Sequence, residues 1–244
     1  MPERLRVLAG DCTVTADGDR DEEYRGYVVC VLKPDNTVLA HDADGYQPVA
    51  WLTRPESVTV ESEGDAFALT ARDGERILRV RSEVPTGRRE FPIAAAGPPV
   101  GDCPDCGGGL VRARGDVTCV DCDERYGLPA GATVLGDACE DCGLPLMRVA
   151  RGERFTLCID RGCESLAAAV RETLDGEYDC PDCGRPLGVR SPDGRTFLGC
   201  EGYPDCETSF SIPAGEVVAD CDCGLPVLET ATGRRCLDGT CESF

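Results

Sequence analysis

The stretch Cys180-Pro-Asp-Cys183-Gly, followed by Cys200-Glu-Gly-Tyr-Pro-Asp-Cys206, decides the architecture of most of this chain. Two cysteines separated by two residues can hold one metal ion from a single tight turn, and a second pair across a hairpin completes a tetrahedron of sulfurs. Zn²⁺ prefers this all-sulfur cage, and a cage closed by four protein ligands is structural rather than catalytic. The stretch therefore predicts a zinc ribbon.

Similar quartets of cysteines follow one another four times along the C-terminal half, and four tandem quartets are a far stronger signal than one pair. They use sixteen of the eighteen cysteines, so we predict four Zn²⁺ ions. The predicted ligands, site by site, are Cys103, Cys106, Cys119 and Cys122; Cys139, Cys142, Cys158 and Cys163; Cys180, Cys183, Cys200 and Cys206; and Cys221, Cys223, Cys236 and Cys241.

A glycine follows the first cysteine pair of every quartet. We expect it to take the positive φ that a metal-binding turn needs, and to bring backbone N–H groups to the sulfurs. The alternatives are a disulfide framework and a redox-active pair. No apolar run resembling a secretory signal lies near the N-terminus, so we expect a cytoplasmic protein, in which paired thiols favour metal. Cys12 and Cys30 have no second pair, and we expect them in the core.

The composition is strongly acidic, with 45 Asp and Glu against 25 Lys and Arg and a formal net charge of −20. Four zinc–thiolate sites would bring the charge to about −28. We interpret this as the composition of a cytoplasmic protein kept soluble at very high salt, as in halophiles. At high salt, phosphate attraction is weak, so nucleic-acid binding would depend on aromatic stacking and a few arginines. No apolar run approaches the length of a membrane span.

The pattern predicts a mainly β protein: an antiparallel β half-barrel or meander, then four small tandem zinc ribbons, with one short helix, Glu164–Thr173, between ribbons two and three. Expected strands of the first domain are Leu5–Thr15, Tyr24–Lys33, Thr37–His41, Ser57–Glu61, Asp65–Ala71 and Arg76–Ser82. The expected boundaries are 1–91 for the β domain, 92–102 for a linker, and 103–131, 132–175, 176–215 and 216–244 for the ribbons.

The segments Ala9–Val14, Lys33–His41 and Tyr46–Trp51 resemble the N-terminal domain of the NucS endonuclease family. The resemblance covers about the first ninety residues and implies a half-barrel that forms a homodimer and contacts DNA. It places Trp51 where the family stacks a tryptophan on an unpaired base, and Tyr46 where the family has an arginine. A DNA-contacting arginine of the family's first hairpin falls at Asp19 or Arg20, of which we favour Arg20.

Two further groups complete the predicted interface of this domain. Arg54 adjoins the Trp51 loop, and Arg79 and Arg81 belong to the most basic run of the chain, which we interpret as a phosphate-tracking rim. The alternatives are core packing for Trp51 and a solvated strand face for the arginines. The nuclease domain of the family is absent from the sequence, and its catalytic lysine has no counterpart, because Lys33 is the single lysine.

Ribbons two and three resemble the four-cysteine zinc ribbons of type IA topoisomerases, through Gly194-Arg-Thr-Phe197-Leu-Gly-Cys200 and Tyr203-Pro-Asp-Cys206 above all. In that family such ribbons bind single-stranded DNA and perform no chemistry. The resemblance nominates Phe155, Phe197 and Tyr203 for stacking on bases, with Arg154 and Arg195 on phosphates. The alternative is that these rings only cover the metal sites.

The sequence thus favours a non-catalytic zinc protein that binds DNA, with single-stranded or branched DNA preferred, in repair, replication or topology. Two alternatives remain. Zinc ribbons also hold proteins together, which would make the chain an adaptor in transcription or repair complexes, and aromatic stacking accepts RNA as well as DNA. We expect no enzymatic activity, because neither nuclease nor topoisomerase catalytic residues are found.

Overall fold

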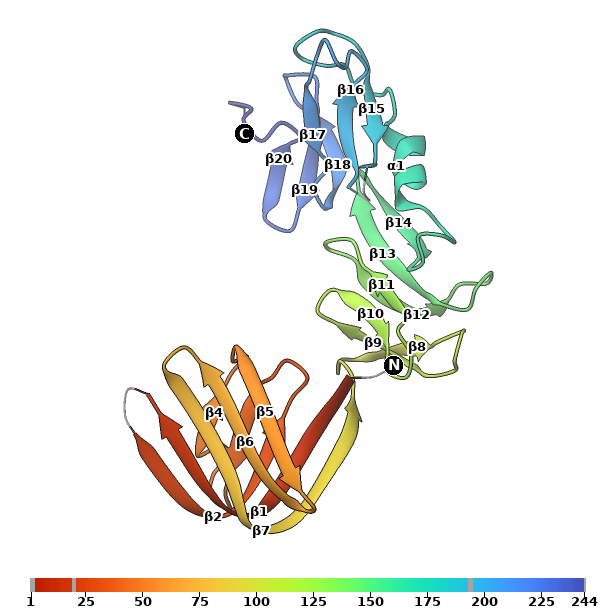
Figure 1. The fold of residues 1–244 in the computed structure, drawn as a ribbon. Coiled ribbons are helices and arrows are strands. Elements are labelled where there is room, and N and C mark those ends of the chain that lie inside the picture. Colours follow the sequence, from red (N-terminus) through yellow and green to blue (C-terminus); the bar gives the residue numbers. More distant parts are fainter. Residues whose placement is uncertain (1–2, 19–20, 193–194, 244) are drawn as a thin grey trace. The chain divides into compact units, whose positions relative to one another are not determined.

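The computed structural model describes residues 3–18, 21–192 and 195–243, and the chain divides into two compact units, Met1–Ala94 and Ala95–Phe244 (Figure 1). The predicted fold class is confirmed: the described part is mainly β, with one helix and four cysteine quartets. Within the described residues, no helix has the length and apolar character that crossing a bilayer takes.

The first unit is one antiparallel sheet of seven strands in the order β4-β3-β2-β1-β7-β6-β5. The sheet curls so that the edge strand β4 also contacts β7. Buried side chains from every strand except β5 fill the concave side and include Cys12 and Cys30. The strands are β1 (Glu3–Asp17), β2 (Glu22–Leu32), β3 (Val38–His41), β4 (Ala50–Leu52), β5 (Ser57–Glu63), β6 (Ala66–Asp73) and β7 (Arg76–Ile93).

One expectation for this unit is corrected. The strand expected at Arg76–Ser82 continues to Ile93, because β1 is long enough to pair with it along its whole length. Pro85 lies where the β1–β7 register shifts, and a bulge is a place where a sheet tolerates proline. At this shift the backbones approach closely, since a Cβ on Gly10 would lie 2.7 Å from the carbonyl oxygen of Val84.

The second unit contains four small antiparallel sheets and helix α1 (Leu166–Leu174). They are β11-β10-β9-β8, β12-β13-β14, β15-β16-β17 and β18-β19-β20. Residues 99–102, assigned to a linker from the sequence, instead form β8 at the edge of the first of these sheets. The strands are β8 (Pro99–Asp102), β9 (Gly109–Ala113), β10 (Asp116–Cys119), β11 (Arg125–Gly127), β12 (Thr133–Ala138), β13 (Pro145–Arg151), β14 (Glu153–Cys158), β15 (Leu187–Arg190), β16 (Phe197–Cys200), β17 (Ser209–Ser211), β18 (Gly215–Asp220), β19 (Pro226–Thr230) and β20 (Gly233–Cys236).

The helix lies where the sequence predicts it, and the side chain of Ser165 caps it by accepting a hydrogen bond from the Ala168 N–H. Its buried residues Val170 and Leu174 pack in a core shared by ribbons three and four. A second core is shared by ribbons one and two, and Phe155 and Leu166 pack against both. The four ribbons therefore pack as two pairs, each with a shared core, rather than as four independent modules.

A backbone connection also joins ribbon two to ribbon four. The Gly152 N–H donates to the Gly215 carbonyl at 2.9 Å, and the Val217 N–H donates back to the Gly152 carbonyl at 2.6 Å. Gly152 has a φ of 82° and a Cβ there would meet Leu174 at 2.6 Å, so the β13–β14 turn depends on a residue without a side chain.

Candidate metal centres and nucleic-acid interface

The structure assembles all four predicted quartets. Within each, the four sulfur atoms lie within 4.8 Å of one another. The closest Sγ–Sγ pairs include Cys183 with Cys200 at 3.3 Å and Cys103 with Cys122 at 3.8 Å. A tetrahedron with Zn–S bonds of about 2.3 Å has S–S edges of about 3.8 Å. The quartets therefore fit Zn²⁺, and all eighteen cysteines are free of disulfides.

The four sites share one construction. The first cysteine pair lies in the turn before a β-hairpin, and the third cysteine is the last residue of the second hairpin strand, as Cys200 is in β16. The first and third cysteines are buried in every site, whereas the second and fourth are more exposed. Each hairpin thereby carries its own sulfur to the sulfurs of the preceding turn.

The glycine that follows each first pair has the predicted positive φ, between 69° and 84°. Its N–H donates to the carbonyl of the first cysteine, at 2.8 Å for Gly184 and Cys180, and so closes the turn. The expectation that the turn brings backbone N–H groups to the sulfurs is met at the first site, where the N–H of Gly108, directly after Gly107, donates to Cys106 Sγ at 3.4 Å. The N–H groups that reach sulfur come from residues two positions after a ligand, such as Gly202, which donates to Cys200 Sγ at 3.2 Å.

Local dipoles also prepare one ligand for metal. The Thr208 hydroxyl lies 3.2 Å from Cys206 Sγ, and together with the Thr208 backbone N–H it lowers the pKa of that thiol to about 6. The thiolate is the form that binds zinc. The sequence analysis missed Thr208, although a hydroxyl residue two positions after a ligand cysteine was a visible signal.

Cys12 and Cys30 behave in the opposite way. Burial, with nearby carboxylates adding to it, raises the pKa of the Cys12 thiol to about 11, and burial raises that of Cys30 to about 12. Both thiols are fully buried in the core of the first unit. They are small core residues that stay protonated at neutral pH, as expected from their lack of partners.

Trp51 is the single tryptophan, and its position corrects one expectation. The stretch around it looked like a loop, but Trp51 is the middle residue of the short edge strand β4 and pairs with Leu39 of β3. Its neighbours Ala50 and Leu52 are buried, so Trp51 faces the other side of the sheet, and the residue is 52% exposed. Tyr46, in the preceding connection, is 88% exposed.

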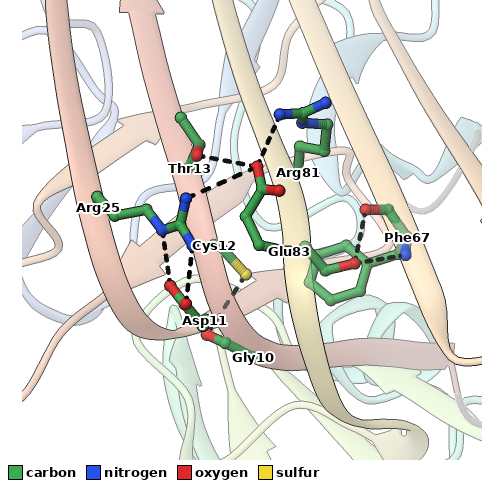
Figure 2. Close-up of polar contacts among 9 residues, drawn as sticks. Gly10, Asp11, Cys12, Thr13, Arg25, Phe67, Arg81 and Glu83 are labelled. Carbon is green, nitrogen blue, oxygen red and sulfur yellow. Dashed lines mark hydrogen bonds and ion pairs between the residues drawn. The ribbon is translucent and has the colours of Figure 1, made fainter.

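Several of the arginines predicted to contact phosphate form ion pairs with carboxylates in this structure. Arg54 lies 3.3 Å from Asp35, Arg81 lies 2.7 Å from Glu83, and Arg79 pairs with Asp17. Figure 2 shows Arg81 in a network in which Glu83 also accepts from Thr13, beside the ion pair of Arg25 with Asp11. Exposed ion pairs of this kind contribute about 0–1 kcal/mol, so an incoming phosphate can displace a carboxylate at low cost. Arg20 lies outside the described residues.

The aromatic residues nominated on the ribbons differ in exposure. Tyr203 is 74% exposed, Phe197 is half-buried, and Phe155 is half-buried against both cores of the second unit. Tyr203 and Phe197 line the same groove of about 660 Å³ on ribbon three, which Arg190 also borders. Arg154 forms an ion pair with Glu216, whereas Arg195 is exposed. The groove therefore brings two of the three nominated rings together.

The family and sequence comparisons agree with the resemblance of the zinc ribbons to those of topoisomerases. The family described as "Topoisomerase DNA binding C4 zinc finger" matches residues 100–118 and 177–215, which are the beginning of ribbon one and the whole of ribbon three. The DNA topoisomerase 1 of Methanothermobacter thermautotrophicus is 39% identical over 122 residues, covering 46% of this chain and 16% of that protein. The one of Thermoplasma acidophilum is 34% identical over 160 residues, covering 57% of this chain and 20% of that protein.

The chain therefore spans no more than a fifth of the length of these topoisomerases. Among solved structures, EndoMS in its apo form matches with a TM-score of 0.33 and 24% identity, over 38% of this chain and 44% of that chain. EndoMS belongs to the NucS endonucleases that the first ninety residues resemble.

Proposed function

We propose that this protein binds DNA without catalysing a reaction on it, and that it prefers single-stranded or branched DNA. The observation that carries the proposal is the groove of ribbon three. This ribbon matches a family described as DNA-binding, and it presents the exposed ring of Tyr203 beside Phe197. Stacking needs an exposed ring and an unpaired base, so such a groove suits a single strand.

The charge of the chain supports the same preference. At a net charge of −20, long-range electrostatics repel a phosphate backbone, and high salt would suppress both this repulsion and the usual attraction to arginines. Base stacking survives high salt because it is not an ionic interaction. Trp51 and Tyr203 are therefore the residues on which we expect affinity to depend, and duplex DNA, whose bases are stacked on one another, offers them little.

The absence of catalysis is part of the proposal. A zinc ion held by four cysteines has no open coordination position for water or substrate, so none of the four quartets suits hydrolytic chemistry. The single lysine, Lys33, lies directly after β2 in the first unit.

Fluorescence anisotropy at molar KCl tests the proposal with labelled single-stranded, duplex and forked DNA, and with single-stranded RNA. We expect Trp51→Ala and Tyr203→Ala each to weaken single-strand binding by about 1–3 kcal/mol, or roughly 5- to 150-fold. Phe91→Ala, which removes an exposed ring elsewhere on the first unit, should leave affinity unchanged. Equal affinity for duplex and single strand, or full affinity in both ring variants, would refute the proposal, and tighter binding to RNA would reassign the ligand.

We also propose that the first unit forms a homodimer through the convex face of its sheet. Tyr27 is 71% exposed and Val29 is 43% exposed, and they alternate with buried residues of β2. Across β1, Val84 lies on the same face, on the other side of the ion-paired Asp11, because Tyr27 and Val84 both pair with Asp11. Exposed apolar residues gathered on one face are typical of protein interfaces.

Sedimentation equilibrium checks the dimer. We expect Val29→Glu to convert a dimer to monomers, because it places a charge in the apolar surface without disturbing the core. Thr59→Glu, which makes an exposed change on β5 of the same sheet, should leave the dimer intact. A wild-type protein that is monomeric at every concentration tested would contradict the proposal.

A further inference from the structure

The second unit contains a cavity of about 380 Å³ beside the N-terminal end of helix α1. Three arginines line it from three different segments. Arg151 comes from the end of β13, Arg161 from the connection between β14 and α1, and Arg195 from the connection between β15 and β16. Three arginines lining one cavity place positive charge beside it, and one of them, Arg161, also donates to the carbonyl oxygen of Gly127 at 3.3 Å.

No carboxylate in the described part of the chain supplies that balance. The cavity lining contains neither Asp nor Glu among the described residues, although acidic residues outnumber basic ones by 45 to 25 in the sequence. None of the three arginines forms an ion pair with a described residue, whereas Arg125, Arg154 and Arg234 of the same unit do. In so acidic a chain, this cavity is a local reversal of charge.

Arg151 is held in place by backbone groups instead. Its guanidinium donates to the carbonyl oxygens of Ala150 at 2.7 Å and Ala130 at 2.9 Å. Burial lowers the pKa of Arg151 below its ordinary value, because the charged form loses hydration without gaining a counter-ion. An anion in the cavity would restore the lost stabilisation, and the fixed guanidinium would meet it with little loss of side-chain entropy.

Neutral groups of the cavity also suit an anion. Ser165 and Leu166, the cap and first residue of α1, are part of the lining, and so is the hydroxyl residue Thr196. The first N–H groups of a helix carry partial positive charge and have no partner within the helix. Combined with three arginines, they favour a negatively charged ligand with several acceptor oxygens.

We propose that this cavity binds a phosphate group, and that the group is a backbone phosphate of the nucleic acid. The assignment to a nucleic-acid strand rests on the proposed function; the affinity of the cavity for phosphate does not. The cavity would supply the ionic contacts that ion-paired Arg54, Arg79, Arg81 and Arg154 provide only after losing their carboxylates. The cavity would hold the strand by its backbone while the rings of Tyr203 and Phe197 stack on unpaired bases.

The test compares the full-length wild type with the double variant Arg151→Gln/Arg161→Gln. Arg114→Gln/Arg235→Gln removes the same charge at exposed positions away from the cavity and is the matched control. Because Arg151 also makes backbone hydrogen bonds, Arg195→Gln is a second variant, as its exposed side chain carries little risk to the fold. Zinc content and circular dichroism verify that each variant is folded.

In the first arm, sodium pyrophosphate is titrated at a constant ionic strength of about 0.1 M, where exposed charges more than about 10 Å apart are screened. It should raise the melting temperature of the wild type and the control but not of the cavity variants. In the second arm, single-strand affinity is measured against salt. Each lost phosphate contact should flatten the log–log slope by about 0.7, so the double variant should lose about 0.7–1.4.

The outcomes separate the two proposals. Changes in both arms, absent from the control, support a strand phosphate. A pyrophosphate effect with an unchanged DNA slope supports the phosphate site and overturns its assignment to the strand. No effect of the cavity variants in either arm overturns the inference. If the wild type binds no DNA, the proposed function fails, but the pyrophosphate arm still shows whether the cavity binds phosphate.

Discussion

Removal of zinc by a chelator is expected to unfold Ala95–Phe244 and to leave Met1–Ala94 folded. The two cores of the second unit each contain buried ligand cysteines from two sites, so loss of the metal removes the bonds that hold each turn to its hairpin within these cores. Structural zinc in small ribbons contributes about 10–16 kcal/mol of apparent binding free energy per site at neutral pH. The first unit has a core of its own. The cysteines in that core are Cys12 and Cys30, and neither of them belongs to a quartet.

Hydrogen exchange measured by mass spectrometry distinguishes the units peptide by peptide. In EDTA, we expect peptides from the ribbons to exchange as rapidly as an unfolded chain, while β1, β2 and β7 stay protected. Fluorescence of Trp51 should change little, because the single tryptophan lies in the first unit. Unchanged protection of the ribbons at zero zinc content would show that their fold does not depend on metal. Loss of protection in β1 at the same chelator concentration would show that the units unfold together.

The sequence was most informative where the structure is local. Each quartet spans a short stretch, and its turn, glycine and hairpin follow one another in the chain, so the spacing predicted both the ligands and the ribbon folds. The Ala-rich composition of Glu164–Thr173 similarly predicted α1. In the first unit, alternation predicted the strands, but their lengths depend on partners far away in the sequence, as β7 shows by pairing with all of β1.

Features that depend on tertiary contacts could not be predicted. Proline on both sides suggested a loop for Trp51, but pairing with β3 makes it part of an edge strand, and prolines are common beside such strands. Arg154 looked available for phosphate, yet it is paired with Glu216, sixty-two residues further along the chain. The arginine cavity draws on three separate segments, so no local pattern could reveal it.

Leu198→Ala is expected to destabilise ribbons three and four together, which tests whether the ribbons fold in pairs. Leu198 is fully buried in β16 and belongs to the core that also contains Leu225, Val227 and Leu228 of ribbon four. A buried Leu→Ala change costs about 2–5 kcal/mol, because the cavity it leaves collapses only in part. Since this core also holds cysteines of the third and fourth sites, both should release zinc faster.

Leu110→Ala is the matched control, because Leu110 is equally buried but belongs to the core of ribbons one and two. Zinc release is followed with a chromogenic chelator, and hydrogen exchange identifies the ribbons that open. We expect two ions to leave early in each variant, from the third and fourth sites in Leu198→Ala and from the first and second in Leu110→Ala. Early loss of a single ion, with normal protection of the neighbouring ribbon, would mean that each ribbon is stable alone and that the shared cores contribute little to metal retention.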